Sequence, residues 1–235
     1  MRDTRLEIRG LSGGYERGVN IVEDICLTVP TGEAVGVIGL NGSGKSTLAK
    51  ALVNLLPYRS GSIFFAGEDV TQKRTHELAR KGIALMHQGG TVFPNLTVRE
   101  NLRFAYGSCW TQHTPGKLAG IFPLFSTPGK LRIMADKLSG GERHELALAM
   151  TLAREPRLLI LDEPSAGLSP AEVTRIYTIL SDLRAASGQS IILIEQNVTR
   201  AAAFCDRCVL METGHATDLG KKNIKDLETI LFNNR

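Results

Sequence analysis

The loop at residues 39–47, Gly-Leu-Asn-Gly-Ser-Gly-Lys-Ser-Thr, constrains the possible folds of this chain more than any other segment. It follows an apolar run, Ala34–Ile38, and precedes apolar residues that recur at helical spacing from residue 48 to residue 56. A strand, then Gly-x-x-x-x-Gly-Lys-Ser, then a helix is the context in which this pattern forms a phosphate-binding loop, or P-loop. The alternative is a glycine-rich turn that happens to carry a lysine, which the complete spacing and both flanks disfavour.

The residue types of this loop indicate how it would hold a nucleotide. Glycines let the backbone curl so that several N–H groups point at phosphate oxygens, and the start of the following helix adds a partial positive charge. The Lys45 ammonium would reach the β- and γ-phosphates, and the Ser46 hydroxyl would bind Mg²⁺. The residues expected to bind the nucleotide here are Gly39, Asn41, Gly42, Ser43, Gly44, Lys45, Ser46 and Thr47.

Strand and helix signals alternate along most of the 235 residues, which favours an α/β fold with a mainly parallel sheet. The length suffices for one substantial α/β domain with a smaller inserted lobe. The net charge of +4 is too small to indicate nucleic acid, and no apolar run approaches the ~18 residues that span a bilayer. We expect strands near 6–11, 21–29, 62–65, 83–86, 158–161, 190–194 and 209–212, and helices near 75–80, 139–154 and 170–186.

Strand signals vanish between about residues 88 and 155. Thr97 and Glu100 have the spacing of a capping box, which predicts a helix start. Residues 107–130 are rich in Gly, Pro, Ser and Thr, so we expect an irregular connection there. Its aromatic residues Trp110, Phe122 and Phe125 are expected in the core of the lobe. The chain is thus predicted to be one α/β core that carries a mostly helical insertion.

Two carboxylates, Asp162 and Glu163, directly follow the apolar residues 158–161. A buried strand that ends in acids brings charge to the carboxyl edge of the sheet, where ligands of open α/β folds bind. Asp162 suits Mg²⁺ as the acidic partner of a P-loop. Glu163 is the candidate to orient or deprotonate a water that attacks the γ-phosphate. The alternative is a pair of solvated acids, which the upstream P-loop disfavours.

The segment Leu-Ser-Gly-Gly-Glu at residues 138–142 begins another helix, with Ser139 and Glu142 as its capping box. Two glycines inside a helix start cost about 1 kcal/mol each relative to alanine. That cost is understandable if backbone N–H groups must lie open for an anion. We therefore expect a second phosphate-contacting surface at Ser139, Gly140, Gly141 and Glu142.

In order and separation, the P-loop, Leu-Ser-Gly-Gly-Glu and Leu-Leu-Ile-Leu-Asp-Glu-Pro resemble the ATP-binding cassette of ABC ATPases, over nearly the whole chain. The resemblance implies a P-loop NTPase with a RecA-like core, an N-terminal antiparallel β part and an inserted helical subdomain. It implies one ATP-binding domain at residues 1–235, with the core at about 1–88 and 156–235 and the helical signature subdomain at about 89–155. It also implies that the signature segment, residues 138–142, closes on the γ-phosphate held by another subunit.

The resemblance assigns further roles. Tyr15 lies where the family places an aromatic residue that stacks on adenine, although a strand-end tyrosine without that role is the alternative. Gln88 resembles the glutamine that senses Mg²⁺ and water, and residues 165–170 resemble the D-loop at the dimer interface. Gln196 occupies the position of the usual switch histidine; its amide can donate a hydrogen bond but does not titrate. The implied catalytic residues are Glu163, Gln88 and Gln196, and the implied Mg²⁺ ligands are Ser46, Gln88 and Asp162.

Two segments narrow the resemblance. Residues 89–98 and the run Ile-Glu-Gln-Asn-Val at 194–198 are similar to LivF-type ATPases of branched-chain amino-acid importers. Gly90 departs from that pattern, which has arginine, and the tail after Gly214 lacks the family's ending. The resemblance implies ATP and Mg²⁺ as cofactors, two membrane-spanning permeases, an identical or sister ATPase, an extracytoplasmic solute-binding protein, no nucleic acid, and a peripheral place on the cytoplasmic face of the membrane.

Three alternatives stay open at this point. Close relatives of the LivF type serve importers of urea and short amides. A soluble ABC ATPase acting in translation or DNA repair would usually carry a second cassette or a large insertion. A P-loop kinase or nucleotide switch would leave residues 138–142 unexplained. The pair Cys205 and Cys208 has C-x-x-C spacing, but with no second pair it is more consistent with reduced structural thiols than with a metal site.

Overall fold

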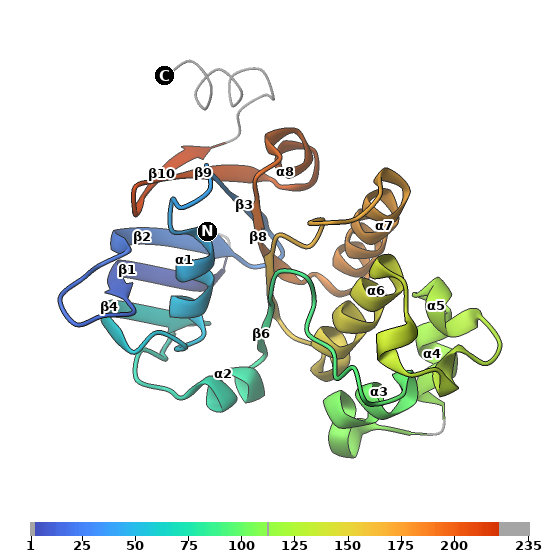
Figure 1. Cartoon of the computed structure of the whole chain (residues 1–235). Coiled ribbons are helices and arrows are strands. Elements are labelled where there is room, and N and C mark those ends of the chain that lie inside the picture. The colour runs from blue at the N-terminus through green and yellow to red at the C-terminus, as the bar shows by residue number, and fades with distance from the viewer. Residues whose placement is uncertain (1–2, 112, 221–235) are drawn as a thin grey trace.

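The computed structural model describes residues 3–111 and 113–220, which form two sheets and a block of helices (Figure 1). The strands are β1 (Thr4–Gly14), β2 (Val22–Pro30), β3 (Ala34–Ile38), β4 (Tyr58–Phe65), β5 (Glu68–Asp69), β6 (Ile83–Met86), β7 (Leu158–Asp162), β8 (Ser190–Glu195), β9 (Arg207–Glu212) and β10 (His215–Gly220). The helices are α1 (Lys45–Leu52), α2 (Thr75–Lys81), α3 (Val98–Tyr106), α4 (Thr114–Ala119), α5 (Pro123–Ser126), α6 (Gly140–Thr151), α7 (Pro170–Ser187) and α8 (Val198–Phe204). Short 3₁₀ turns lie at Gly107–Cys109, Lys130–Arg132, Ala135–Lys137 and Leu152–Arg154.

The central sheet has the strand order β10-β9-β3-β8-β7-β6, and only the β10–β9 pair is antiparallel. Every residue of its inner strands β3, β7 and β8 is buried, and because successive side chains point to opposite sides, both faces of the sheet are covered there. In β7, Leu158 and Ile160 pack in one core cluster with α1, whereas Leu159 and Leu161 pack in another with α6 and α7. The two faces of the sheet are therefore covered by different layers, with α1 on one side and α6 and α7 on the other (Figure 1).

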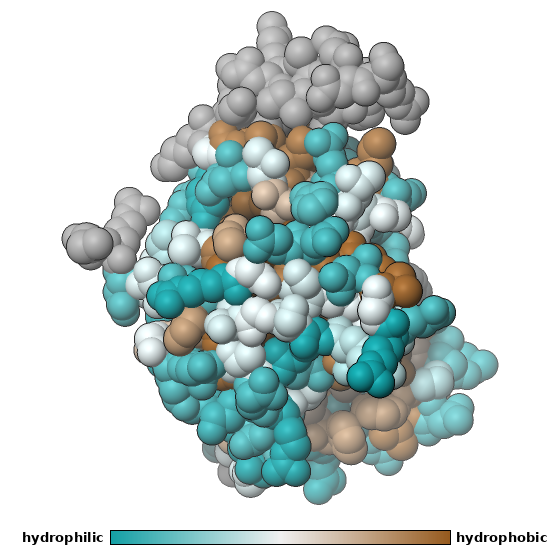
Figure 2. Space-filling view, turned by 90° about the vertical axis from the view of Figure 1, so that its left-hand side faces the viewer, coloured by the Kyte–Doolittle hydropathy of each residue, from teal (hydrophilic) through white to brown (hydrophobic). Residues whose placement is uncertain are grey.

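The second sheet is antiparallel, with the order β2-β1-β4-β5. Its inner face is apolar, since Leu6 and Ile8 are buried in the cluster that contains α1. The alternate residues Glu7 and Arg9 pair with each other on the outer face. Figure 2 views the molecule from this side, where hydrophilic residues cover most of the surface. Such one-sided burial is typical of an antiparallel sheet that closes a domain.

A helical block, residues 98–154, lies between β6 and β7 in the chain. Thr97 and Ser139 cap α3 and α6 as the sequence predicts. Phe122 and Phe125 are buried in its core and Trp110 packs against that core, also as predicted. The expectation of an irregular connection at 107–130 is wrong, because α4, α5 and two 3₁₀ turns lie there. Prolines at the starts of α4 and α5 are compatible with a first helical turn, so proline-rich composition did not exclude helices.

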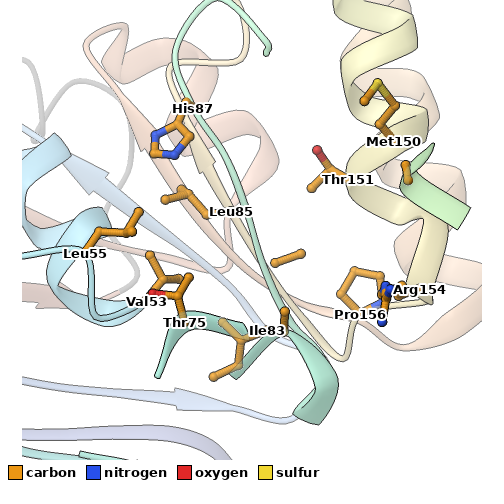
Figure 3. Close-up of a pocket in the computed structure, with 13 residues that line it drawn as sticks. Val53, Leu55, Thr75, Ile83, Leu85, His87, Met150, Thr151, Arg154 and Pro156 are labelled. Carbon is orange, nitrogen blue, oxygen red and sulfur yellow. The ribbon is translucent and has the colours of Figure 1, made fainter. Parts of the chain in front are cut away.

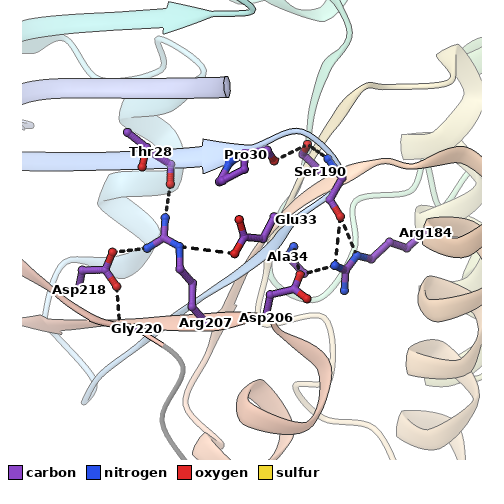
Figure 4. A network of polar contacts seen from close by, with 11 residues as sticks. Thr28, Pro30, Glu33, Ala34, Arg184, Ser190, Asp206, Arg207, Asp218 and Gly220 are labelled. Carbon is purple, nitrogen blue, oxygen red and sulfur yellow. Dashed lines mark hydrogen bonds and ion pairs between the residues drawn. The ribbon is translucent and has the colours of Figure 1, made fainter. Parts of the chain in front are cut away.

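A polar network fixes the amino ends of the central strands (Figure 4). The Arg184 guanidinium on α7 donates to the carbonyl oxygen of Gly32 and to the carboxylate of Asp206. Asp206 in turn accepts the N–H of Ala34, the first residue of β3. Arg207 bridges the Thr28 carbonyl oxygen and Asp218. These contacts hold β3, and with it the loop that follows its far end, in a fixed position relative to α7 and β9.

The predicted strands and helices are otherwise confirmed to within a few residues, and the sequence did not indicate β5 or β10. Leu55 was expected on the helix after the P-loop, but α1 ends at Leu52 and the Leu55 side chain is exposed. Within the described residues, no helix combines the length and apolar character that crossing a bilayer requires. The end of the chain, whose departure from the LivF-type pattern was noted above, lies largely outside the described residues.

Candidate active site at the carboxyl edge of the central sheet

The P-loop connects the end of β3 to the start of α1. Gly39 adopts φ +156°, and a Cβ there would lie 2.2 Å from the Met211 carbonyl oxygen, so only glycine allows β9 to pass so closely. Gly44 caps α1 in the left-handed region at φ +101°. The buried Lys45 ammonium donates to the carbonyl oxygens of Gly39 and Leu40, both at 2.8 Å. The loop thus curls around its own lysine and holds a desolvated positive charge at its centre.

Asp162, at the end of β7, faces Ser46 in the first turn of α1. The Ser46 hydroxyl donates to Asp162 Oδ1 at 3.0 Å, and the Asp162 side chain is only 3% exposed. Burial raises the pKa of Asp162, and the hydrogen bond from Ser46 lowers it in part. The fold therefore places a carboxylate where its charge is poorly solvated. A hard cation would relieve that cost, because Mg²⁺ prefers oxygen ligands such as these.

Glu163 lies between two glutamines that come from neighbouring strand ends. Gln88, after β6, donates from Nε2 to Glu163 Oε2 at 2.7 Å. Gln196, after β8, donates from Nε2 to Glu163 Oε1 at 2.6 Å. Glu163 itself adopts φ +49°, a left-handed conformation that a non-glycine residue rarely takes and that is often found at functional sites. The three residues expected to be catalytic are thus joined by hydrogen bonds through Glu163.

The signature segment, 138–142, is placed elsewhere in the molecule. Ser139 Oγ accepts the Glu142 N–H, and the Glu142 carboxylate accepts the Ser139 N–H and pairs with Lys130. The contacts found for Ser139, Gly140, Gly141 and Glu142 among the described residues stay within the helical block or run to α7. Because α1 and α6 cover opposite faces of the central sheet, one copy of the chain does not bring its signature segment to its own P-loop (Figure 1).

Tyr15 follows β1 and lies beside the P-loop helix. Its hydroxyl accepts a hydrogen bond from Lys50 Nζ at 3.0 Å, and the same nitrogen lies 5.2 Å from the ring centre. The Tyr15 side chain is 43% exposed. Hydrogen bonds from Lys50 and Thr47 outweigh partial burial and lower the pKa of Tyr15. Lys50 therefore holds the ring in position while much of the ring stays open to solvent, and this arrangement is compatible with a stacked base.

A buried polar cluster behind the site was not predicted from the sequence. Glu195, the last residue of β8, accepts hydrogen bonds of 2.6 Å from both Ser165 Oγ and Tyr177 Oη. Arg200 on α8 donates to Ser165 Oγ at 3.0 Å. Burial, followed by the nearby Glu195 carboxylate, raises the pKa of Tyr177. The available signal was an acid at the end of an otherwise apolar strand, the same signal that marked Asp162.

Gly90, the departure from the LivF-type pattern, lies against α6. It adopts φ +64°, and a Cβ at this position would lie 2.6 Å from the Ala147 Cβ. We expect Gly90→Ala to destabilise the protein by about 1–3 kcal/mol, because it combines backbone strain with overpacking. Chemical denaturation measures this free energy of unfolding. Adding Ala147→Gly should restore part of it, whereas equal losses in both backgrounds would exclude the steric explanation.

Two of the histidines lie near these groups. His87 directly precedes Gln88, and His144 on α6 is buried, with Nδ1 3.0 Å from the Gly140 carbonyl oxygen, whereas His76, His113 and His215 are exposed. Cys205 and Cys208 are free thiols that flank Gly36. Burial raises the pKa of both thiols, that of Cys208 to about 11. High pKa values keep thiols protonated and unreactive, in agreement with a structural role.

An open pocket of about 280 Å³ lies between the α/β part and the helical block (Figure 3). Leu55 and Ile83 line one side, Met150 and Arg154 the other, and His87 the rim beside Gln88. None of the predicted site residues lines it. The pocket is therefore a second concave surface, distinct from the candidate active site.

Comparison with known proteins agrees with the resemblance seen in the sequence. The pattern of the ABC transporter family matches residues 22–166. The branched-chain amino acid transport ATP-binding protein BraG of Pseudomonas aeruginosa is 37% identical, covering 85% of this chain and 86% of that protein. A probable branched-chain amino acid transport ATP-binding protein, LivF of Archaeoglobus fulgidus, is 35% identical, with coverages of 91% and 90%. The lipopolysaccharide export ATP-binding protein LptB of Escherichia coli is 32% identical, with coverages of 89% and 88%.

A solved structure described as the ATP-binding subunit of an ABC transporter is 28% identical, with a TM-score of 0.79 and coverages of 97% and 93%. The predicted fold class and the predicted resemblance to branched-chain amino-acid transport ATPases are thereby confirmed. Family match, overall similarity and fold all lead to the same assignment. The chain belongs to the ABC transporter family of ATPases.

Proposed function

We propose that this protein is the ATP-hydrolysing subunit of an ABC importer for branched-chain amino acids. The observation that carries ATP hydrolysis is the contact of Glu163 with Gln88 and Gln196, next to a P-loop lysine and the Ser46–Asp162 pair. The similarity to BraG and LivF supports import of branched-chain amino acids. Glu163 is the acceptor for a proton of the attacking water, and the two amides orient its carboxylate. Lys45 and the P-loop N–H groups bind the phosphates, and Tyr15 stacks on the base.

Mg²⁺ fits the oxygen donors of Ser46 and Asp162. Mg²⁺ in nucleotide sites is held by one or two carboxylates together with the substrate phosphates, so one buried aspartate and a hydroxyl are sufficient protein ligands. The raised pKa of Asp162 supports this assignment, because a buried carboxylate without a cation is costly. Gln88 is the third proposed ligand. When bound, the cation neutralises charge that develops on the β- and γ-phosphate oxygens.

The site is proposed to be completed by a second ATPase subunit, identical or related. The start of α6 is on the other face of the sheet from the P-loop, so its N–H groups would serve a neighbouring subunit's nucleotide. Closure of the pair around two ATP molecules is the step that would move the permeases. Residues 89–155 are proposed to act as a helical subdomain in this movement, against the core formed by the rest of the chain.

Two permeases and a solute-binding protein are the proposed partners, with the chain at the cytoplasmic face of the membrane. The pocket of Figure 3 is the proposed permease contact, because its lining comes from both the α/β part and the helical block. A permease segment bound there would contact both parts, so it would move when the helical block moves relative to the α/β part. Alternatives are a urea or amide importer and a soluble ABC ATPase; the similarity to LptB favours export as a further candidate.

Purification of the chain from native membranes with its permeases, followed by reconstitution into liposomes, tests this proposal. ATP hydrolysis should rise when the co-purified solute-binding protein is added with leucine, isoleucine or valine. Stimulation by urea or amides alone would favour the first alternative. Co-purification without any solute-binding protein would point to export, and the lack of any membrane partner would overturn the proposal.

A further inference from the structure

Glu172 on α7 contacts two helix starts at once. Its Oε2 accepts the N–H of Ser169, which is the capping box of α7. Its other oxygen lies over the first turn of α6, since a Cβ built on Gly141 would be 2.0 Å from Glu172 Oε1. By contrast, nothing lies within 4 Å of a Cβ built on Gly140. Of the two signature glycines, one is open to solvent and the other is covered by a carboxylate.

The electrostatics of this contact favour an ionised Glu172. The N–H groups of Ser169 and Gly141 both stabilise its carboxylate, and with Arg175 one turn further along α7 they lower the pKa of Glu172. Two helix N-termini therefore direct their partial positive charges at one anion. A phosphate oxygen bound at a helix N-terminus makes the same kind of interaction as the Glu172 carboxylate makes here.

Under the proposed function, the α6 start receives the γ-phosphate of the nucleotide held by another subunit. Glu172 then occupies the position of an anion before that phosphate arrives. Two anions cannot share the Gly141 N–H, because like charges a few ångströms apart in a partly buried site repel each other. Glu172 also lies just after the proposed D-loop, residues 165–170, so its displacement would reach the segment proposed to cross the dimer interface.

We infer that in a separated subunit the Glu172 carboxylate occupies the anion-binding position at the start of α6, the signature helix. The γ-phosphate displaces it when two subunits close around ATP. The inference rests on the proposed function, and it makes Glu172 a residue that sets the ATP concentration needed for closure. Removing its charge should make closure easier. It should leave the P-loop affinity for ATP in a single subunit unchanged, because Glu172 has no contact there.

The test compares two matched variants in a Glu163→Gln background, where slowed hydrolysis allows the closed pair to accumulate. Glu172→Gln removes the charge while keeping an oxygen that can accept the Ser169 N–H. Glu100→Gln makes the same change in the capping box of α3, outside the signature segment. Sedimentation against MgATP concentration should show half-maximal dimer formation at roughly fivefold lower ATP for Glu172→Gln, the scale of a helix-terminus charge interaction. Half-maximal ATP that is equal in both variants, or higher for Glu172→Gln, would overturn the inference.

The Gly141 amide signal in a ¹⁵N–¹H spectrum provides a readout that does not need the dimer. It should shift in Glu172→Gln and stay in place in Glu100→Gln. An unchanged Gly141 signal in Glu172→Gln would overturn the inference even if dimers form. If the Glu163→Gln protein does not pair at any ATP concentration, alone or with its co-purified sister ATPase, the proposed closure is wrong, and Glu172 does not set its ATP requirement.

Discussion

Glu163→Gln is expected to lower the rate of ATP turnover by roughly 10²–10⁴-fold while ATP still binds, the range associated with loss of a general base. The wild-type carboxylate accepts one hydrogen bond on each oxygen, from Gln88 and from Gln196. A glutamine has nearly the same shape but cannot take a proton from water at neutral pH. The substituted side chain keeps one oxygen acceptor, whereas its NH₂ group would face one of the two amide donors. It therefore loses its basicity and one of the two hydrogen bonds that orient the wild-type carboxylate.

Phosphate release measures turnover, and binding of a fluorescent ATP analogue measures affinity. Glu68→Gln is a suitable control, since it makes the same chemical change in an exposed carboxylate that pairs with Lys81 on the surface. Undiminished hydrolysis in Glu163→Gln would reject Glu163 as the base. A large loss of affinity would instead show that the substitution disturbs the P-loop.

Lys45→Ala is expected to weaken ATP binding by about 10- to 100-fold, which corresponds to one charge-assisted hydrogen bond of ~1.5–3 kcal/mol. The Lys45 ammonium is buried, and burial lowers its pKa although Glu163 and Asp162 oppose that effect. A desolvated cation of this kind interacts strongly with a phosphate. Its removal also leaves the Gly39 carbonyl oxygen without this donor and the Leu40 carbonyl oxygen with only the Ser43 N–H, so the loop should become less ordered as well.

Isothermal titration with ATP separates these two effects when it is combined with the melting temperature of the nucleotide-free protein. Lys117→Ala, on an exposed part of α4, is the matched control for loss of a lysine. Weaker binding with an unchanged melting temperature would place the effect on the phosphate contact. Unchanged affinity would contradict the role proposed for Lys45.

The sequence was informative where local spacing determines geometry. A strand, a glycine-rich turn and a helix are contiguous in the chain, so residues 39–47 predicted the P-loop without any knowledge of the sheet order. Capping boxes at Thr97 and Ser139 involve only four residues each, and both are present. The role of Asp162 and Glu163 was predictable for the same reason, because two acids at the end of a buried strand have few explanations other than a ligand site.

The arrangement of the site required the tertiary fold. Gln88, Glu163 and Gln196 lie more than thirty residues apart in sequence, and only the order β8-β7-β6 makes their strand ends neighbours. The resemblance to a family predicted each of the three as a catalytic residue but not the contacts between them. Their hydrogen bonds and the left-handed backbone of Glu163 are properties of the folded chain. The contact of Glu172 with Gly141 could not be predicted from the sequence, because it depends on how α6 packs beside α7.

The two glutamines around Glu163 have a consequence for how hydrolysis responds to acidity. Neither amide gains or loses a proton in the physiological range, unlike a histidine in the same place. The two donors that orient the proposed base are therefore insensitive to pH in that range. An ATPase built in this way would keep both amide donors beside Glu163 during acid stress.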